Sequence, residues 1–218
     1  MYNKGVARMR GERAGLSRDR VVSAALDVLE REGVDALSMR RVAAALGVAP
    51  NALYSHVADK GALLEAVMDA VLADVEIPAR GAWRAQLERI LASTRRVLLG
   101  HPSLVPLFLA RQSTGPNALR LGEAMLAQLH RAGLDDREAA RALQILLVHT
   151  IGATAFEVPR RDDPDPTARS RRAEERAGAL DPDTHPHTAR GAAHLSRHPA
   201  DEVFATGLRW LLDGLAPT

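Results

Sequence analysis

The sequence contains no cysteine and few aromatic residues, and both absences narrow its class. Without cysteine the chain forms neither disulfides nor thiolate metal sites, which fits a reducing cytoplasm. Aromatic residues make up only 3% of the 218 residues while aliphatic residues and alanine abound, a balance that favours helix packing over sheets. No apolar run approaches the roughly twenty residues that span a bilayer, and the basic N-terminus lacks the apolar core of a signal peptide. We therefore expect an all-α, cytoplasmic protein.

The sequence also lacks the common catalytic motifs. It contains no phosphate-cradling glycine loop, no H-E-x-x-H, no E-x-x-H pair and no G-x-S-x-G. A structural zinc site needs four ligands on ordered elements, and most of the candidate ligands fall in a segment predicted to be irregular. We expect no enzyme, no metal and no cofactor; a helical-bundle enzyme built on the histidine cluster is the alternative. The candidate ligands are Asp183, His185, His187, His194 and His198.

The stretch 37–60 reads LSMRRVAAALGVAPNALYSHVADK and predicts two short helices joined by a tight turn. Ser38 is suited to cap the first helix, because its hydroxyl accepts a hydrogen bond from a free backbone N–H. Gly47 ends that helix, since glycine takes the left-handed conformation without steric cost, and Pro50 fits the first position of the next. We expect the first helix to bury Val42, Ala45 and Leu46.

The second of these helices, about 50–56, is short and polar. Its geometry with the first is that of a helix-turn-helix, whose second helix enters the major groove of DNA. In such a groove asparagine and histidine bond base edges, alanine meets a thymine methyl, and tyrosine and serine reach phosphates. An ordinary αα-corner with a solvated outer face is the alternative. The helix should bury Leu53 and turn outward Asn51, Ala52, Tyr54, Ser55 and His56.

Further motifs surround this stretch at fixed spacing. An apolar first helix ends in EREG, and a V-x-x-L-S entry leads into R-R-V-A-x-x-L-G-V. The motifs x-x-L-Y-x-H-V and K-x-x-L-L follow without a gap. In this order, residues 16–72 resemble the DNA-binding domain of the tetracycline-repressor (TetR) family of transcriptional regulators. The L-Y-x-H-V form is most similar to the tetracycline-repressor branch itself.

The resemblance implies two kinds of contact with DNA. Base edges would be read by Asn51, Ala52 and His56, with an apolar contact from Met39. Phosphates would be held by basic and hydroxyl side chains of the same two helices and by Lys60 at the start of the next. The predicted DNA-binding set is Ser38, Met39, Arg40, Arg41, Pro50, Asn51, Ala52, Tyr54, Ser55, His56 and Lys60.

The match to the tetracycline branch is uneven over this set. Four members match in kind: Arg40, Tyr54, His56 and Lys60. At four others that branch carries different residues: Met39, Pro50, Asn51 and Ser55. We therefore expect an operator sequence that differs from the one read by the tetracycline branch.

We expect the chain to divide into three parts. Residues 1–16 form a basic, irregular arm that contacts phosphates or the minor groove, or else a solvated leader. Residues 17–76 form the helix-turn-helix domain, with a first helix at 17–32 and a bridging helix capped by Asp59. Residues 77–218 are expected to be all-helical, and the family resemblance implies that they form the effector-binding and dimerisation domain. Its expected helices span about 82–99, 103–110, 116–133, 135–157, 189–196 and 199–214.

Residues 159–190 differ from their surroundings. They are rich in proline and charge and nearly devoid of large aliphatic residues. Such a segment cannot offset its ordering entropy by burial. We expect a mobile loop that begins where Pro159 ends the preceding helix, with at most a helical turn at 168–176.

The helices at about 135–157 and 199–214 carry wide apolar faces. Pairing them across a two-fold axis would make an intermolecular four-helix bundle; burial within one monomer is the alternative. The family resemblance implies the same homodimer. Its two recognition helices would then reach successive major grooves, ~34 Å apart, on a near-palindromic operator.

In the TetR family the second domain holds a cavity for a small-molecule effector. The tetracycline branch binds its drug and magnesium through two histidines, an asparagine and a phenylalanine. This chain carries Glu76, Ile90, Thr94 and Phe108 at or near those positions, so we expect a more apolar effector and no binding of magnesium–tetracycline. Each candidate lining residue is also compatible with a plain core. The candidates are Trp83, Ile90, Thr94, Phe108, Arg111, Met125, Gln144, His149 and Phe156.

These expectations combine into a ligand-responsive transcriptional repressor. It would bind a double-stranded DNA operator as a homodimer and leave it when a small, largely apolar effector fills the cavity. The alternative is a small-molecule-binding helical dimer without regulatory DNA binding.

Overall fold

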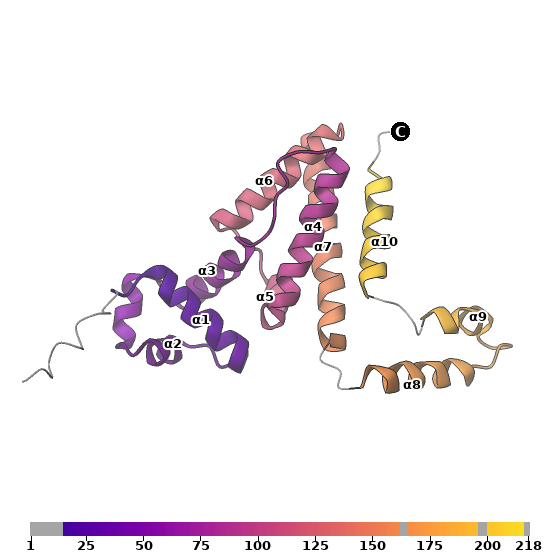
Figure 1. The fold of residues 1–218 in the computed structure, drawn as a ribbon, viewed down its shortest axis with the longest axis horizontal. Coiled ribbons are helices and arrows are strands. Elements are labelled where there is room, and N and C mark those ends of the chain that lie inside the picture. The colour runs from indigo at the N-terminus through magenta and orange to yellow at the C-terminus, as the bar shows by residue number, and fades with distance from the viewer. Residues whose placement is uncertain (1–14, 162–164, 196–199, 216–218) are drawn as a thin grey trace, which may run out of the picture. The chain divides into compact units, whose positions relative to one another are not determined.

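A computed structural model gives the fold, and it describes residues 15–161, 165–195 and 200–215. Every regular element within these residues is a helix (Figure 1). In chain order the elements are α1 (Arg18–Glu32), α2 (Met39–Leu46), the 3₁₀ helix η1 (Pro50–Ser55), α3 (Lys60–Leu72), α4 (Trp83–Gly100), the 3₁₀ helix η2 (Pro102–Leu104), α5 (Val105–Ala110), α6 (Pro116–Arg131), α7 (Asp136–Arg161), α8 (Pro166–Gly178), α9 (Pro186–Leu195) and α10 (Ala200–Asp213). The basic arm at 1–16 lies almost wholly outside the described residues.

The chain divides into two compact units inside α3, the first ending at Val67 and the second beginning at Met68. The sequence had placed this boundary later, after residue 76. The difference arises because the C-terminal part of α3 is already part of the second unit. Leu72 and Val75 belong to the same buried cluster as Leu87 on α4.

Local chemistry determines where the helices of the first unit begin and end. The Ser17 hydroxyl accepts from the Arg20 N–H, and the Ser38 hydroxyl from the Arg41 N–H, each at 3.2 Å. Asp59 accepts from the Ala62 N–H at 2.8 Å and so caps α3. The caps at Ser38 and Asp59 confirm the sequence expectation, because each needs only one side chain and the backbone next to it.

The buried face of α2 was partly mispredicted. Val42 is fully buried as expected, but Ala45 is exposed and Leu46 only half-buried. Met39 and Ala43 take their places in the core. Residues 42–46 are all apolar, so their spacing did not distinguish one helix face from the next.

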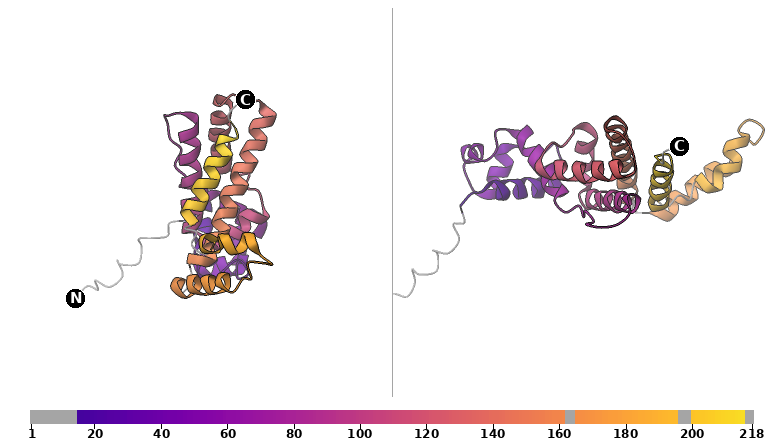
Figure 2. Two further views of the ribbon diagram at one scale, coloured as in Figure 1. Left: turned by 90° about the vertical axis from the view of Figure 1, so that its right-hand side faces the viewer. Right: turned by 90° about the horizontal axis from the view of Figure 1, so that it is seen from above.

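In the second unit α7 contacts α4, α5, α6 and α10, and α10 runs alongside it (Figures 1 and 2). The shared core is aliphatic with one aromatic ring, Phe204, which matches the low aromatic content of the chain. Its most deeply buried side chains come from α4, α6, α7 and α10: Leu87, Ile90, Leu91, Met125, Leu129, Ala139, Leu146 and Leu212.

Two expectations about α7 were wrong. The helix runs on to Arg161 and does not stop at Pro159. Proline removes one backbone N–H···O bond and crowds the turn before it, but this does not prevent the next two residues from staying helical. By length and composition, residues Asp136–Pro159 would also suffice to cross a bilayer, which the sequence reading had missed. In the fold, however, this helix packs against four others.

The segment 159–190 also differs from the expected loop. It contains α8 and the start of α9, and these two helices pack against each other. One small side chain of each, Ala168 on α8 and Ala192 on α9, is buried. The anticipated turn at 168–176 is the middle of α8. Alanine, arginine and glutamate favour helix locally, and counting large aliphatic residues does not register this preference.

Candidate DNA-binding and effector sites

A glycine corner joins α2 to η1 in the first unit. Gly47 has φ 66° and ψ 31°, and its N–H reaches the Ala43 and Ala44 carbonyls. This left-handed conformation is the one predicted for it, and any side chain there would be strained. The chain then extends through Ala49 and starts η1 at Pro50. Two short helices joined by so tight a turn form a helix-turn-helix.

The second helix of this motif is held by one side chain. Leu53 is fully buried, whereas Tyr54 is 52% exposed. The element is a 3₁₀ helix of six residues, tighter than the α-helix the sequence suggested. Ser55 contributes to the tight turn by donating its hydroxyl to the Ala52 carbonyl at 2.8 Å. The outward side chains are therefore presented by the scaffold beneath them rather than by a stable helix of their own.

Most of the predicted DNA-binding residues are accessible in this unit. Ala52 and His56 are half-buried, and Met39 is the one buried member, at 9% exposure. Met39 thus serves the core of the unit, which weighs against the apolar base contact expected for it. The exposed members are Ser38, Arg40, Arg41, Pro50, Asn51, Tyr54, Ser55 and Lys60.

Arg41 is already paired within the protein. Its Nε lies 2.8 Å from Glu32 Oε2 and its Nη2 lies 2.5 Å from Oε1, a two-pronged ion pair that ties α2 to the end of α1. The hydrogen bond from Arg41 lowers the pKa of Glu32, and the same bond raises the pKa of Arg41. Arg41 can reach a phosphate only by sharing or leaving this partner. Arg40 and Lys60 are the cations better placed to meet DNA.

The structure does not bring the nine predicted effector residues into one cavity. Ile90, Thr94 and Met125 are buried in the packed core of the second unit. Trp83, Phe108 and His149 are half-buried, the first two packed against that core. The remaining three are exposed: Arg111, Gln144 and Phe156.

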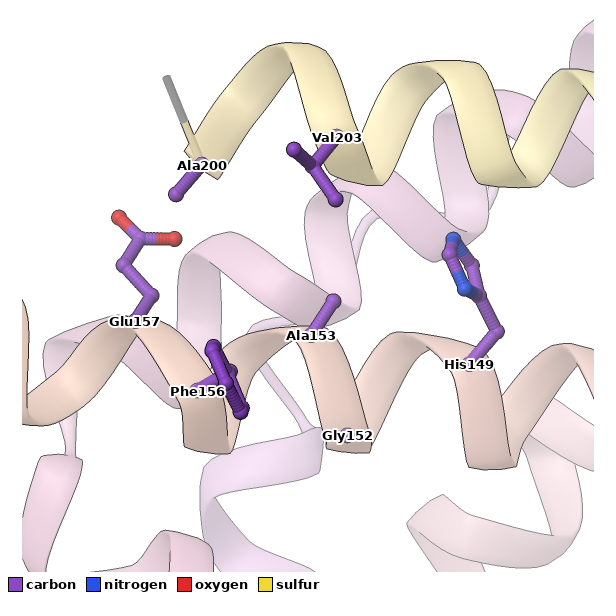
Figure 3. A pocket seen from close by; sticks show the side chains of 7 residues that line it. All are labelled: His149, Gly152, Ala153, Phe156, Glu157, Ala200 and Val203. Carbon is purple, nitrogen blue, oxygen red and sulfur yellow. The ribbon is translucent and has the colours of Figure 1, made fainter. Parts of the chain in front are cut away.

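A pocket of about 260 Å³ opens between α7 and α10, and it takes in two of the nine predicted residues. His149, Ala153 and Glu157 project from α7 toward α10 in Figure 3, and Phe156 stands at the opening beside them. Val203 closes the pocket from α10. Its walls are mainly apolar, with one carboxylate and one imidazole.

An arginine that the sequence analysis overlooked lies behind this pocket. Arg95 on α4 pairs with Glu157, and with Asp201 at 2.7 Å, and its guanidinium carbon lies 5.0 Å from the centre of the Phe204 ring. The His149 ring also stacks on Phe204, with 5.5 Å between the two ring centres. Its Nε2 lies 3.0 Å from the Phe204 carbonyl oxygen. This network fastens α10 to α4 and α7. The sequence clue was a charge within the apolar stripe of α4.

A second surface of α7 and α10 is apolar and uncovered. Val148 is 72% exposed on α7 and Trp210 is 71% exposed on α10. The exposed apolar area on these two helices also includes Ile145, Phe156 and Val203. Large apolar side chains concentrated on two packed helices are typical of a protein–protein interface.

Comparison with known proteins agrees with this architecture. Residues 21–67 match the family model for bacterial regulatory proteins of the tetR family, and residues 77–218 match the tetracyclin repressor-like C-terminal domain. An HTH-type transcriptional regulator of Saccharopolyspora erythraea is 34% identical over 211 residues, covering 93% of this chain and 86% of the relative.

Two solved structures carry the same fold. The Streptomyces coelicolor TetR family protein ActR, in complex with actinorhodin, superposes with a TM-score of 0.86 at 31% identity, covering 93% of this chain and 96% of ActR. BioQ bound to its double-stranded DNA operator superposes with a TM-score of 0.64 at 27% identity, covering 93% of this chain and 99% of BioQ. With both its units matched, the chain belongs to the TetR family of bacterial transcriptional regulators.

Proposed function

We propose that the protein is a cytoplasmic, ligand-responsive repressor that binds a near-palindromic operator as a homodimer. The observation that carries this function is the glycine corner and the short helix after it. That helix buries only Leu53 and exposes Asn51 and Tyr54 to solvent. Relatives of the same family include an operator-bound protein and an actinorhodin-bound protein, which supports both halves of the proposal.

The contacts follow from the chemistry of the exposed side chains. Asn51 and His56 read base edges, Ala52 meets a thymine methyl, and Tyr54 with Lys60 holds phosphates. Arg40 adds a phosphate contact from α2, while Arg41 remains with Glu32. The chain supplies one such set, so a two-fold pair is needed to reach two half-sites.

The dimer forms through α7 and α10. Their exposed apolar side chains, chief among them Val148, Phe156 and Trp210, become the core of an intermolecular four-helix bundle. The pocket beside Phe156 is then covered by the second copy. Covering this face removes an apolar surface that would otherwise promote nonspecific association.

The effector enters the second unit among α4, α5, α6 and α7. Ile90, Thr94 and Met125 are buried in the packed core, so a ligand must separate helices to reach them. Such a ligand shifts DNA affinity only by the difference in its binding to the two states, typically about 1–3 kcal/mol. Its contacts here would be mostly apolar, with Thr94 as a polar group.

Selection from a random double-stranded DNA library tests this function. The wild-type protein is expected to enrich a duplex with two inverted half-sites one helical turn apart and to shift it in a gel at nanomolar concentration. Enrichment of no sequence over the starting library, by folded protein, would contradict regulatory DNA binding. It would favour the alternative, a small-molecule-binding dimer.

Tetracycline with magnesium is expected to leave the melting temperature unchanged. The positions that would hold the drug carry Glu76, Ile90, Thr94 and Phe108, and Glu76 is exposed with its carboxylate 3.2 Å from Arg96. None of the four side chains is a histidine that could carry the metal. Thermal unfolding with and without the drug and magnesium measures this, and a clear rise in melting temperature would contradict it.

A further inference from the structure

A buried aspartate lies in the apolar C-terminal part of α3. Asp69 is 7% exposed, with the fully buried Val67 and Met68 immediately before it. A carboxylate in such surroundings requires hydrogen bonds to compensate for its lost hydration. Asp69 finds them on another helix, nearly fifty residues away in the sequence.

The partner is the N-terminus of α6. Oδ1 of Asp69 accepts from the backbone N–H of Asn117 at 3.0 Å and of Ala118 at 2.9 Å, and Oδ2 accepts from the Asn117 side-chain amide at 3.1 Å. The residue that precedes α6, Gly115, has no side chain with which to cap it. Asp69 therefore serves as the N-cap of a helix to which it does not belong.

The approach of the two helices depends on Gly115. A Cβ atom at this position would collide with the carboxyl group and Cβ of Asp69. Its φ of −71° is open to any residue, so backbone conformation does not require glycine here. The close contact with Asp69 is what requires glycine at this position.

A second contact runs in the opposite sense. Arg120, one turn into α6, donates through Nη2 to the carbonyls of Leu72 at 3.2 Å and Ala73 at 3.3 Å, where α3 ends. The negative charge of Asp69 thus meets the positive end of α6, and the positive charge of Arg120 meets the negative end of α3. Each helix dipole is complemented by a side chain of the other helix. We call Asp69, Gly115, Asn117 and Arg120 the α3–α6 joint.

The joint connects two elements with different tasks. α3 begins in the unit that holds the glycine corner and continues without a break into the second unit. α6 supplies Leu121, Met125 and Leu129 to the core in which the effector is proposed to bind. A ligand that displaces α6 must therefore stretch or break the joint, and the change acts on a helix shared with the DNA-binding unit.

We propose that the closed α3–α6 joint holds the operator-binding state and that an effector releases DNA by opening it. This inference rests on the proposed function, and it assigns to Asp69 and Gly115 a positioning role rather than a contact with DNA or ligand. Its short-range hydrogen bonds suit a two-state element, since they are either made or broken. Closed, the joint satisfies two otherwise unpaired N–H groups of α6.

Two substitutions open the joint without touching the DNA-binding residues. Asp69→Asn removes the charge and sets an amide donor against the Asn117 amide, while Gly115→Ala inserts a methyl group where Asp69 lies. Each is expected to weaken binding to the selected operator at least tenfold in a gel-shift titration. The salt dependence of binding should stay as in the wild type, because no phosphate contact is lost. Dimer mass and helical circular dichroism should also be unchanged.

Asp74→Asn is the matched control, because it removes the same charge from an exposed site just beyond α3 and should bind as the wild type does. Wild-type affinity in folded, dimeric Asp69→Asn protein would overturn the proposal, and so would tighter binding. A shallower salt dependence would also overturn it, since that result indicates a lost phosphate contact. Failure of the wild type to select any operator would instead refute the proposed function, so the two failures are distinguishable.

Discussion

Lys60→Ala is expected to weaken operator binding about a hundredfold and to reduce its salt dependence. A phosphate contact of this kind contributes about 1.4 kcal/mol, a factor of about ten, and a homodimer loses it twice. Each lost contact also lowers the slope of log affinity against log salt by about 0.9, so the expected reduction is roughly 2. Gel-shift titrations of the selected duplex at several salt concentrations measure both quantities.

Arg89→Ala is the matched control for this substitution. It removes the same charge from an exposed position on α4, in the other unit, and should change neither affinity nor slope by much. Tyr54→Phe tests the neighbouring contact, because it keeps the exposed ring and deletes only the hydroxyl. Unchanged affinity in Lys60→Ala protein would remove Lys60 from the interface and refute this orientation of the helix-turn-helix on DNA.

Val148→Asp is expected to convert the dimer into a monomer and to weaken operator binding by at least about a hundredfold. The substitution places a carboxylate in the centre of the proposed α7–α10 bundle, once in each copy, where it has no partner. A monomer holds one half-site and loses the effective concentration that linkage supplies, which is worth about 10² to 10⁴ in affinity. Size-exclusion chromatography with light scattering gives the mass, and gel shift gives the affinity.

Leu109→Asp provides the comparison for Val148→Asp. Leu109 is 60% exposed, similar to Val148, but it lies on α5 and outside the proposed interface. Its replacement should leave the dimer intact. If Val148→Asp protein remained dimeric at micromolar concentration while Leu109→Asp protein dissociated, the interface would have to be sought elsewhere.

The features predicted best from sequence depend on neighbouring residues. The Ser38 cap, the left-handed Gly47, the start at Pro50 and the buried Leu53 each need only a few residues of local context. The fold class and the family followed from the same stretch, because its motifs lie at fixed spacing without gaps. Most helix boundaries in the second unit were also close, since glycine and proline lie at them; the exceptions are α7, which continues past Pro159, and α8, which was expected to be a loop.

The features that were missed depend on distant parts of the chain. Asp69 meets its partners only when α6 returns to it, and nothing in the sequence near Asp69 names Asn117. Arg95 likewise finds Glu157 and Asp201 on other helices. The proposed effector residues were chosen by polarity and position in the chain, which do not reveal how tightly the core closes over them.

The six-residue helix η1, which we propose meets DNA, contributes a single side chain, Leu53, to the interior. Folding stability therefore places little constraint on its other positions. Residues there can be substituted during evolution while the scaffold stays intact. Recognition can drift toward a new promoter, one amino acid at a time, at almost no thermodynamic risk. The architecture therefore lets operator specificity evolve separately from the fold.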